Sequence, residues 1–248
     1  MFPLRDHNPS TRVPYVTYGL ILANVGVFLG YVGLFADPRS LEAFFFDWAM
    51  IPARVSGGEG AVTLVTSMFL HGGWMHLLGN MLFLWIFGDN LEDEFGHGGF
   101  LAFYLAGGIG AAVAHWLSAP GSPIPTVGAS GAIAAVMGGY LLFFPRARVD
   151  LLLILVILVR IVPVPAWAML GLWFALQLLN GVGSDASVGG VAYWAHAGGF
   201  VVGFVLALPG FVRRGGPRFW RRTDGHPPHP EARYTLRASG VPRAGRRR

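Results

Sequence analysis

The chain has 248 residues, of which 54% are hydrophobic and only 12% are charged. Soluble domains carry roughly twice that share of charged residues, so this composition argues against a water-soluble fold. Because there is no cysteine, disulfides, thiolate nucleophiles and thiolate metal sites are excluded.

Several long stretches contain no Asp, Glu, Lys or Arg, and uncharged apolar runs of about 18 residues or more are typical of membrane spans. We therefore predict an all-α fold, a polytopic membrane bundle of six transmembrane helices. In chain order the helices are expected at about residues 15–36, 61–88, 98–119, 128–144, 166–182 and 191–211.

The apolar segment 151–159 is too short to cross a bilayer before it meets Arg160, since nine helical residues rise only about 14 Å. Pro163 and Pro165 then interrupt it. We interpret the segment as an interfacial or re-entrant piece that leads into helix 166–182. The connection 37–60 is rich in aromatic residues, which favour the level of the membrane interface.

Three regions follow from this pattern: an N-terminal segment (1–12), a six-helix membrane domain (13–212) and an Arg-rich tail (213–248). The Pro, Gly and Arg content of the tail predicts disorder. The positive-inside rule places the tail, together with Arg5 and Arg12, in the cytoplasm. We expect a multi-pass protein of the cell membrane (plasma or inner) with both termini cytoplasmic and with membrane lipid as a partner.

Polar residues inside the predicted spans are candidates for function, because a polar side chain in a membrane is costly. In this topology helices 61–88, 128–144 and 191–211 begin at the external face, and helix 98–119 ends there. All the candidates therefore fall in the outer half of the membrane: His71, His76, Asn80, His115, Ser130 and His196.

Helix 128–144 is short, so its start is expected below the external surface, where free N–H groups and the helix dipole favour negative charge. A tetrahedral oxyanion needs that environment. Ser130 lies at this start, and His196 is able to act as its general base if the two helices meet. His76 and Asn80 share one helix face and both can donate hydrogen bonds, which suits an oxyanion hole. The glycines expected to let the helices approach are Gly128, Gly131, Gly199 and Gly203.

The stretches HGGWMHLLGN, VGASGAIAAVMGGY and AYWAHAGGFVVG, in that order, resemble the rhomboid family of intramembrane serine proteases. G-x-S-G alone is a weak signal, but the three stretches together are a strong one, and with their spacing they cover about residues 13–212. The resemblance implies a cavity open to the outer face and helix 166–182 as a lateral gate. It also implies single-span membrane proteins as substrates, cut near the outer end of the span.

For the residues, the resemblance implies Ser130 as nucleophile and His196 as base, a dyad without an acidic third member. It implies that His76, Asn80 and the backbone N–H of Ser130 stabilise the oxyanion. Some members carry an aromatic residue one turn after the serine, packed against the base, where this chain has Ala134. The group that orients the base is therefore left open, with Trp194, the backbone or Asp185 as alternatives.

Three other functions are open to such a chain. A proteolytically inactive relative that binds membrane clients would lose the serine or the histidine, and both are present. A transporter needs polar residues through both membrane halves, whereas here they stop at one. A zinc protease would need a motif such as H-E-x-x-H or a carboxylate within a span, and the sequence has neither. We expect no cofactor, no metal and no nucleic acid partner.

Overall fold

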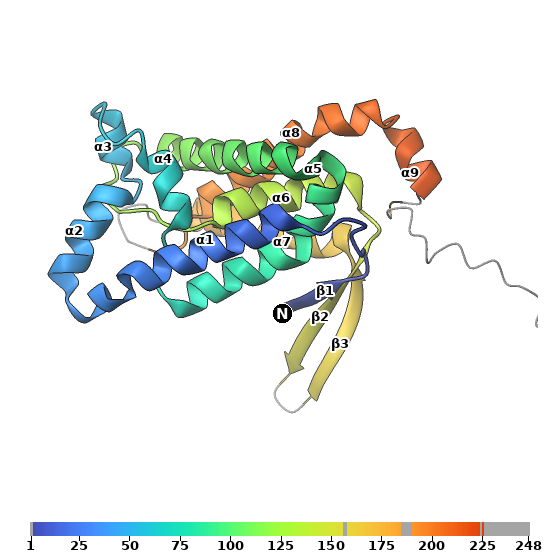
Figure 1. Ribbon diagram of the computed structural model, residues 1–248, viewed down its shortest axis with the longest axis horizontal. Coiled ribbons are helices and arrows are strands. Elements are labelled where there is room, and N and C mark those ends of the chain that lie inside the picture. Colours follow the sequence, from blue (N-terminus) through green and yellow to red (C-terminus); the bar gives the residue numbers. More distant parts are fainter. Residues whose placement is uncertain (1, 156–157, 185–189, 224, 226–248) are drawn as a thin grey trace, which may run out of the picture.

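The structure is a computed structural model that describes residues 2–155, 158–184, 190–223 and 225. Helices dominate it, and a small antiparallel sheet lies at one end (Figure 1). The helices are α1 (Tyr15–Tyr31), α2 (Pro38–Trp48), α3 (Pro52–Ser56), α4 (Thr63–Thr66), α5 (Trp74–Ser118), α6 (Ser130–Phe143), α7 (Ala166–Gly183), α8 (Tyr193–Arg213) and α9 (Pro217–Thr223). The 3-10 helices are η1 (Val32–Ala36) and η2 (Ser67–Phe69), and the strands are β1 (Phe2–Asp6), β2 (Arg148–Leu155) and β3 (Leu158–Pro165).

Four helical segments of the described chain are long and apolar enough to cross a membrane: Tyr15–Ala36, Trp74–Ser118, Ala166–Gly183 and Tyr193–Arg213. The helix α6 is equally apolar but shorter, with 14 residues. These helices pack side by side into one bundle, with α6 in its middle (Figure 1). The prediction of a polytopic helical bundle is thus confirmed, and the number of six membrane passes stays a prediction.

The helix α5 has 45 residues, and a straight helix of that length would measure about 68 Å, more than twice a hydrocarbon core. It breaks at Gly96, where φ is 71° and ψ is 165°, a conformation that favours glycine. Figure 1 shows the two halves running in opposite directions. The start and the end of α5 therefore lie at the same end of the bundle.

The expected start of the second helix, residue 61, is wrong. The apolar run from 61 is split into α4 and η2, and a continuous helix begins only at Trp74, after Gly73 with φ of 156°. Hydropathy does not distinguish a long helix from short turns that are equally buried. His71 consequently lies in the connection before α5 and not within a helix.

The acidic stretch 89–94, which lies between the expected helices 61–88 and 98–119, continues the first half of α5. Buried Glu92 accepts hydrogen bonds from the backbone N–H groups of Val16 and Thr17 at 2.8 and 2.7 Å, and from the Thr17 hydroxyl at 2.7 Å. These N–H groups belong to the first turn of α1, where no intrahelical acceptor exists. The carboxylate thus caps α1 from another element.

The fold is not strictly all-α, because β2 and β3 pair as antiparallel strands where an interfacial or re-entrant segment was expected. The strand β2 pairs antiparallel with β3 and, on its other side, with β1. Pro163 and Pro165 lie on the edge strand β3, where a missing N–H is tolerated. Alternate residues Val149 and Leu151 face the core and are 0% and 4% exposed.

The hairpin returns the chain to the end of the bundle where α6 finishes, because the Ala166 N–H donates to the Ala147 carbonyl at 2.7 Å. It does not cross the bundle (Figure 1). The helix α7 then runs back along the bundle, so that α6 and α8 begin at the same end. Ser130 and His196 can meet only in this arrangement.

Disorder was expected from Arg213 onward, but the helix α9 in this region packs against the bundle. Phe219 is 5% exposed and its ring lies 5.7 Å from that of Phe143. The Trp220 indole donates to the Leu142 carbonyl at 2.9 Å. Residues 224 and 226–248 lie outside the described part of the chain.

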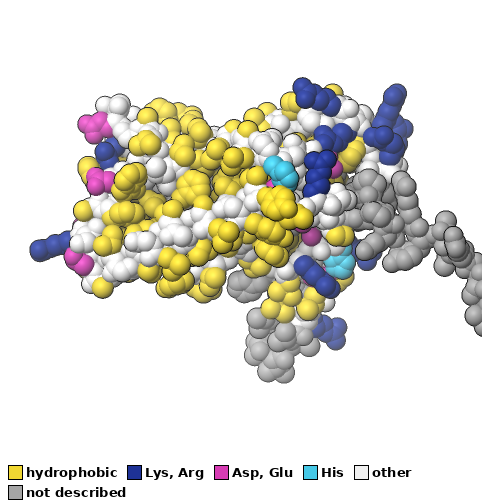
Figure 2. Space-filling view, in the orientation of Figure 1, with side chains coloured by type: hydrophobic (Ala, Val, Ile, Leu, Met, Phe, Trp, Pro, Cys, Tyr) yellow, Lys and Arg dark blue, Asp and Glu magenta, His cyan; other side chains and the backbone are white. Residues whose placement is uncertain are grey.

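Arginine side chains gather at the end of the bundle that carries α9, and apolar side chains cover the middle of the face shown in Figure 2.

Backbone-to-backbone contact between α6 and α8 forms the centre of the bundle. A Cβ atom at Gly203 would lie 2.0 Å from the Ala135 carbonyl oxygen, and one at Gly199 would lie 2.2 Å from that of Gly131. On the α6 side, a Cβ at Gly138 would lie 2.1 Å from the Phe200 carbonyl oxygen. Small residues thus allow the backbones of α6 and α8 to approach closely.

The N-terminal strand brings a titratable group against α6. The Tyr140 hydroxyl donates to Asp6 Oδ2 at 2.6 Å, and burial raises the pKa of Asp6 from 3.8 to about 8.

Because of this raised pKa, folded Asp6 keeps a proton that the unfolded chain releases above pH 4. The free energy of unfolding should therefore fall as pH rises from about 4 to 8. Asp6→Asn removes this titration and keeps an acceptor for Tyr140. Thermal unfolding of both proteins across that range should show a shallower pH dependence for Asp6→Asn, and equal slopes would contradict the prediction.

Candidate active site

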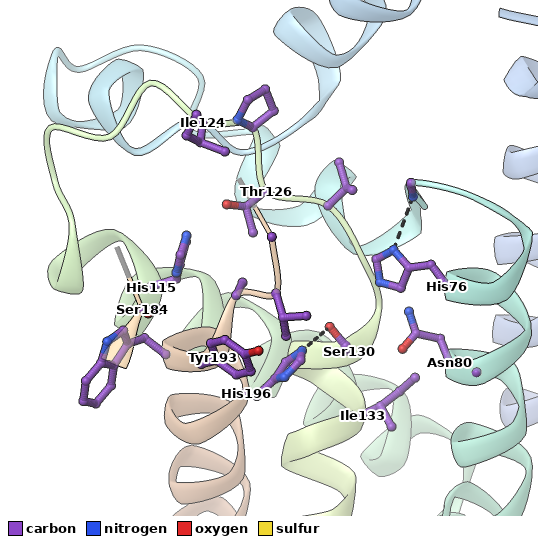
Figure 3. A pocket seen from close by; sticks show the side chains of 18 of the residues that line it. His76, Asn80, His115, Ile124, Thr126, Ser130, Ile133, Ser184, Tyr193 and His196 are labelled. Atoms are coloured by element: carbon purple, nitrogen blue, oxygen red, sulfur yellow. Dashed lines mark hydrogen bonds between the residues drawn. The ribbon is translucent and has the colours of Figure 1, made fainter. Parts of the chain in front are cut away.

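A cavity of about 840 Å³ lies where α6 and α8 begin. Its walls come from both halves of α5, from α6, α7 and α8, and from the loop that precedes α6. Figure 3 shows the polar side chains that surround it. The structure brings five residues singled out by sequence to this one cavity: His76, Asn80, His115, Ser130 and His196.

Ser130 is the first residue of α6, and the conformation of the preceding loop fixes its place. Gly128 has φ of 129°, and a Cβ there would lie 2.7 Å from His76 Nε2. The Gly128 N–H donates to the Ser67 carbonyl at 2.9 Å, which ties the loop to η2. Gly128 was expected to let two helices approach, but it instead lets the loop before α6 pass close to His76. Because α6 spans only about 21 Å, its first N–H groups lie below the end of the bundle, next to the cavity.

His196 lies within hydrogen-bonding distance of the serine. Its Nε2 is 2.8 Å from Ser130 Oγ, and its Nδ1 is 2.9 Å from Gln177 Oε1 (Figure 3 shows the first contact). The Gln177 amide N–H donates to the Trp173 carbonyl at 3.4 Å, which leaves its oxygen toward the imidazole. An amide oxygen only accepts, so Nδ1 carries the proton and Nε2 presents a lone pair to the serine hydroxyl.

Gln177 was missed by the sequence analysis, which considered Trp194, the backbone or Asp185 as the orienting group. Trp194 lies against Gly181 instead, and Asp185 lies outside the described residues. The ring of Trp173 packs near the imidazole, with centroids 5.9 Å apart. A signal for Gln177 existed, since it is a polar residue inside a predicted span.

His76 and Asn80 lie on the other side of Ser130, one turn apart on α5 (Figure 3). The Gly72 N–H donates to His76 Nδ1 at 3.3 Å, which leaves Nε2 as the protonated nitrogen, close to Gly128 and Ser130. The Asn80 side chain is 8% exposed, and its Nδ2 has no hydrogen-bond partner among the described protein groups. Two donors thus converge on the space beside the serine hydroxyl.

The remaining histidines have different surroundings. The backbone N–H and carbonyl of His71 both bond to the Tyr31 hydroxyl, at 2.6 and 2.8 Å, so this residue fixes the connection before α5. His115 lines the cavity on the side away from Asn80. The described residues contain no group of three His, Asp or Glu side chains arranged to hold a metal ion.

The arrangement has the parts of an acyl-transfer site. A hydroxyl bonded to the free nitrogen of a neutral imidazole is an activated nucleophile. The helix start and the side chains of His76 and Asn80 supply donors near the position of a developing oxyanion. No Asp, Glu, Lys or Arg lies among the described residues that line the cavity, so these dipoles dominate its electrostatics.

Comparison with known proteins gives a consistent result. The Rhomboid domain family model matches residues 59–213. The rhomboid protease GluP of Bacillus subtilis is 32% identical over 154 residues, which cover 59% of this chain and 26% of GluP. RHOMBOID-like protein 4 of Arabidopsis thaliana is 36% identical over 179 residues, 69% of this chain and 40% of that protein. The mitochondrial Rhomboid protein 1 of Saccharomyces cerevisiae is 29% identical over 198 residues, 78% of this chain and 53% of that protein. The chain thus spans about half or less of the length of these relatives.

Proposed function

The chain belongs to the rhomboid family, and from that premise we propose that it is an intramembrane serine endopeptidase that cleaves single-span membrane proteins near the outer end of their transmembrane segment. The observation that carries the proposal is the distance of 2.8 Å between Ser130 Oγ and His196 Nε2 at a buried helix start. The relative named rhomboid protease GluP supports the same reaction class.

In the proposed mechanism, His196 Nε2 takes the hydroxyl proton while Ser130 Oγ attacks the carbonyl carbon of the substrate. The tetrahedral oxyanion accepts hydrogen bonds from Asn80 Nδ2, His76 Nε2 and the Ser130 N–H. His196 then gives its proton to the leaving amine, and the acyl enzyme forms. Water, deprotonated by the same imidazole, hydrolyses the acyl enzyme and restores the serine.

We further propose six membrane passes: α1, each half of α5, α6, α7 and α8. The arginine-rich end that carries α9 would then lie in the cytoplasm, and the cavity would open to the outer face of the cell membrane. Residues 13–212 would make up the protease domain within lipid, with β1 and α9 packed on it. Some relatives are mitochondrial by name, so the identity of the membrane is part of the proposal.

The direct test uses the purified full chain in lipid vesicles with a panel of single-span substrates. We expect cleavage near the outer end of the span, in products identified by mass spectrometry, and we expect it to persist with a metal chelator. Complete loss of cleavage on chelation would contradict the serine mechanism. An absence of cleavage of every substrate would instead favour an inactive client-binding relative.

Replacing Asn80 with alanine should lower kcat by about 10²- to 10³-fold and leave KM nearly unchanged. The reason is that the unpartnered Nδ2 donor meets an oxygen only when the tetrahedral intermediate forms. The matched control is Leu78→Ala on the same turn, whose side chain is 57% exposed on the outside of the bundle. A kcat of Asn80→Ala equal to that of the control would contradict the proposed oxyanion role.

A further inference from the structure

The nitrogen of His196 that faces away from the serine has a defined partner. The Nδ1–H donates to Gln177 Oε1 at 2.9 Å, and Gln177 is only 8% exposed. The Gln177 amide is itself held, because its N–H donates to the Trp173 carbonyl. The imidazole therefore has both of its nitrogens bonded, one to the nucleophile and one to α7.

The partner residue lies on the face by which α7 contacts the bundle. The buried positions of α7 are Ala166, Leu170, Gln177 and Gly181, which fall on one helical stripe. Several large apolar residues lie on the outward face, and among them Leu179 and Val182 are 70% and 79% exposed. Next to Gln177 the rings of Phe174 and Phe200 stack at 4.8 Å, which fixes α7 against α8. The packing of α7 thus sets the position of the amide oxygen.

We propose that Gln177 is the positioning residue of the base, so that the site works as a Ser130–His196–Gln177 relay carried by α6, α8 and α7. This inference rests on the proposed protease function and adds a third member to its dyad. The amide oxygen holds the tautomer in which Nε2 is free to accept the serine proton. It also accepts from the Nδ1–H of the imidazolium that forms after proton transfer.

The choice of an amide over a carboxylate has a physical reason. A buried charge within a membrane helix is costly unless it is paired, and no cation lies among the described residues that line this cavity. A neutral acceptor orients the ring without that cost. Because the acceptor lies on α7, displacement of this helix from α8 would leave the base without its orienting bond.

The first test replaces the acceptor without adding charge. In Gln177→Leu we expect kcat to fall by about 10²-fold with KM little changed, as is typical for a misplaced catalytic group. The rate at which a fluorophosphonate labels Ser130 should fall by a similar factor, since labelling needs the same activated hydroxyl but no substrate helix. The matched control is Asn180→Leu, an exposed polar residue one turn away on α7, for which both rates should stay at the wild-type level.

The second test restores an acceptor and adds charge. Gln177→Glu should keep Ser130 labelling at neutral pH within about tenfold of wild type, and should move the acidic limb of the kcat/KM profile to higher pH. The reason is that a carboxylate beside the ring favours the imidazolium, which cannot accept the serine proton. The other titratable groups that line the cavity, His76, His115 and Tyr193, are unchanged in this variant. Asn180→Glu controls for the added charge and should leave the limb in place.

The outcomes separate this inference from the proposed function. Full activity and labelling of folded Gln177→Leu would overturn the relay while the Ser130–His196 mechanism stands. If Gln177→Leu does not fold, the pH profile of Gln177→Glu decides, and an unmoved acidic limb overturns the relay. Wild-type protein that neither cleaves nor becomes labelled would instead remove the proposed function itself.

Discussion

Replacing Ser130 or His196 with alanine should reduce cleavage of a single-span substrate by about 10⁴-fold or more, the largest loss expected of any substitution in this protein. In the proposed mechanism Ser130 Oγ supplies the attacking atom, and His196 Nε2, which lies 2.8 Å away, removes its proton. Because the two groups act as one unit, the double variant should be about as inactive as either single variant. Rates are measured with purified proteins in vesicles under single-turnover conditions.

The control for this experiment is Ser118→Ala. The Ser118 hydroxyl also lines the cavity, but it donates to the His115 carbonyl and does not contact the imidazole. It should retain cleavage within a few-fold of wild type. Thermal unfolding should show that all four variants fold, although His196→Ala also loses the ring contact with Trp173. Cleavage that survives both Ser130→Ala and His196→Ala would end the assignment of the nucleophile and the base.

Gly203→Ala should lower the free energy of unfolding by about 3 kcal/mol or prevent folding, although it adds only one methyl group. The new Cβ would lie 2.0 Å from the carbonyl oxygen of Ala135 and 2.4 Å from its carbonyl carbon and its Cα. These are backbone atoms of α6, so no side chain can rotate to make room and the helices must separate. Unfolding is followed by heat or by denaturant in mild detergent.

The separation would also affect chemistry, because α6 carries Ser130 and α8 carries His196. Any folded fraction of Gly203→Ala should therefore show slower fluorophosphonate labelling per folded molecule. Gly171→Ala on α7 is the matched control, because a Cβ there meets no atom within 4 Å. It should be neutral or slightly stabilising, as expected for glycine to alanine in a helix interior. Equal unfolding midpoints for the two variants would contradict the close approach of α6 and α8.

The apolar pattern was sufficient to place the helices that face lipid along their length. The expected spans 15–36, 166–182 and 191–211 agree within two residues with the observed segments. The start of the second span was misplaced because the residues of α4 and η2 are as apolar as a helix, and only the Gly72–Gly73 pair marks the break. The hairpin of β2 and β3 was missed because a continuous apolar run does not distinguish a strand from a short buried helix.

The site was more predictable than the fold around it. Polar side chains in an apolar span are conspicuous, and the topology brought Ser130 and His196 to one end of the bundle without any contact information. Gln177 was not identified because its role depends on which face of α7 meets α8, and this is a property of tertiary packing. The helix α9 was missed for a related reason, since Phe219 and Trp220 find their partners only on the folded bundle.

The most direct measurement of the central claim is the position of a covalent fluorophosphonate adduct on the active full-length protein. The label is applied to a preparation that cleaves a single-span substrate, and the modified peptide is identified by mass spectrometry. We predict one adduct, on Ser130, formed in step with the loss of cleavage and absent from His196→Ala. An adduct on a different hydroxyl, or full inhibition without any adduct on Ser130, would contradict the account.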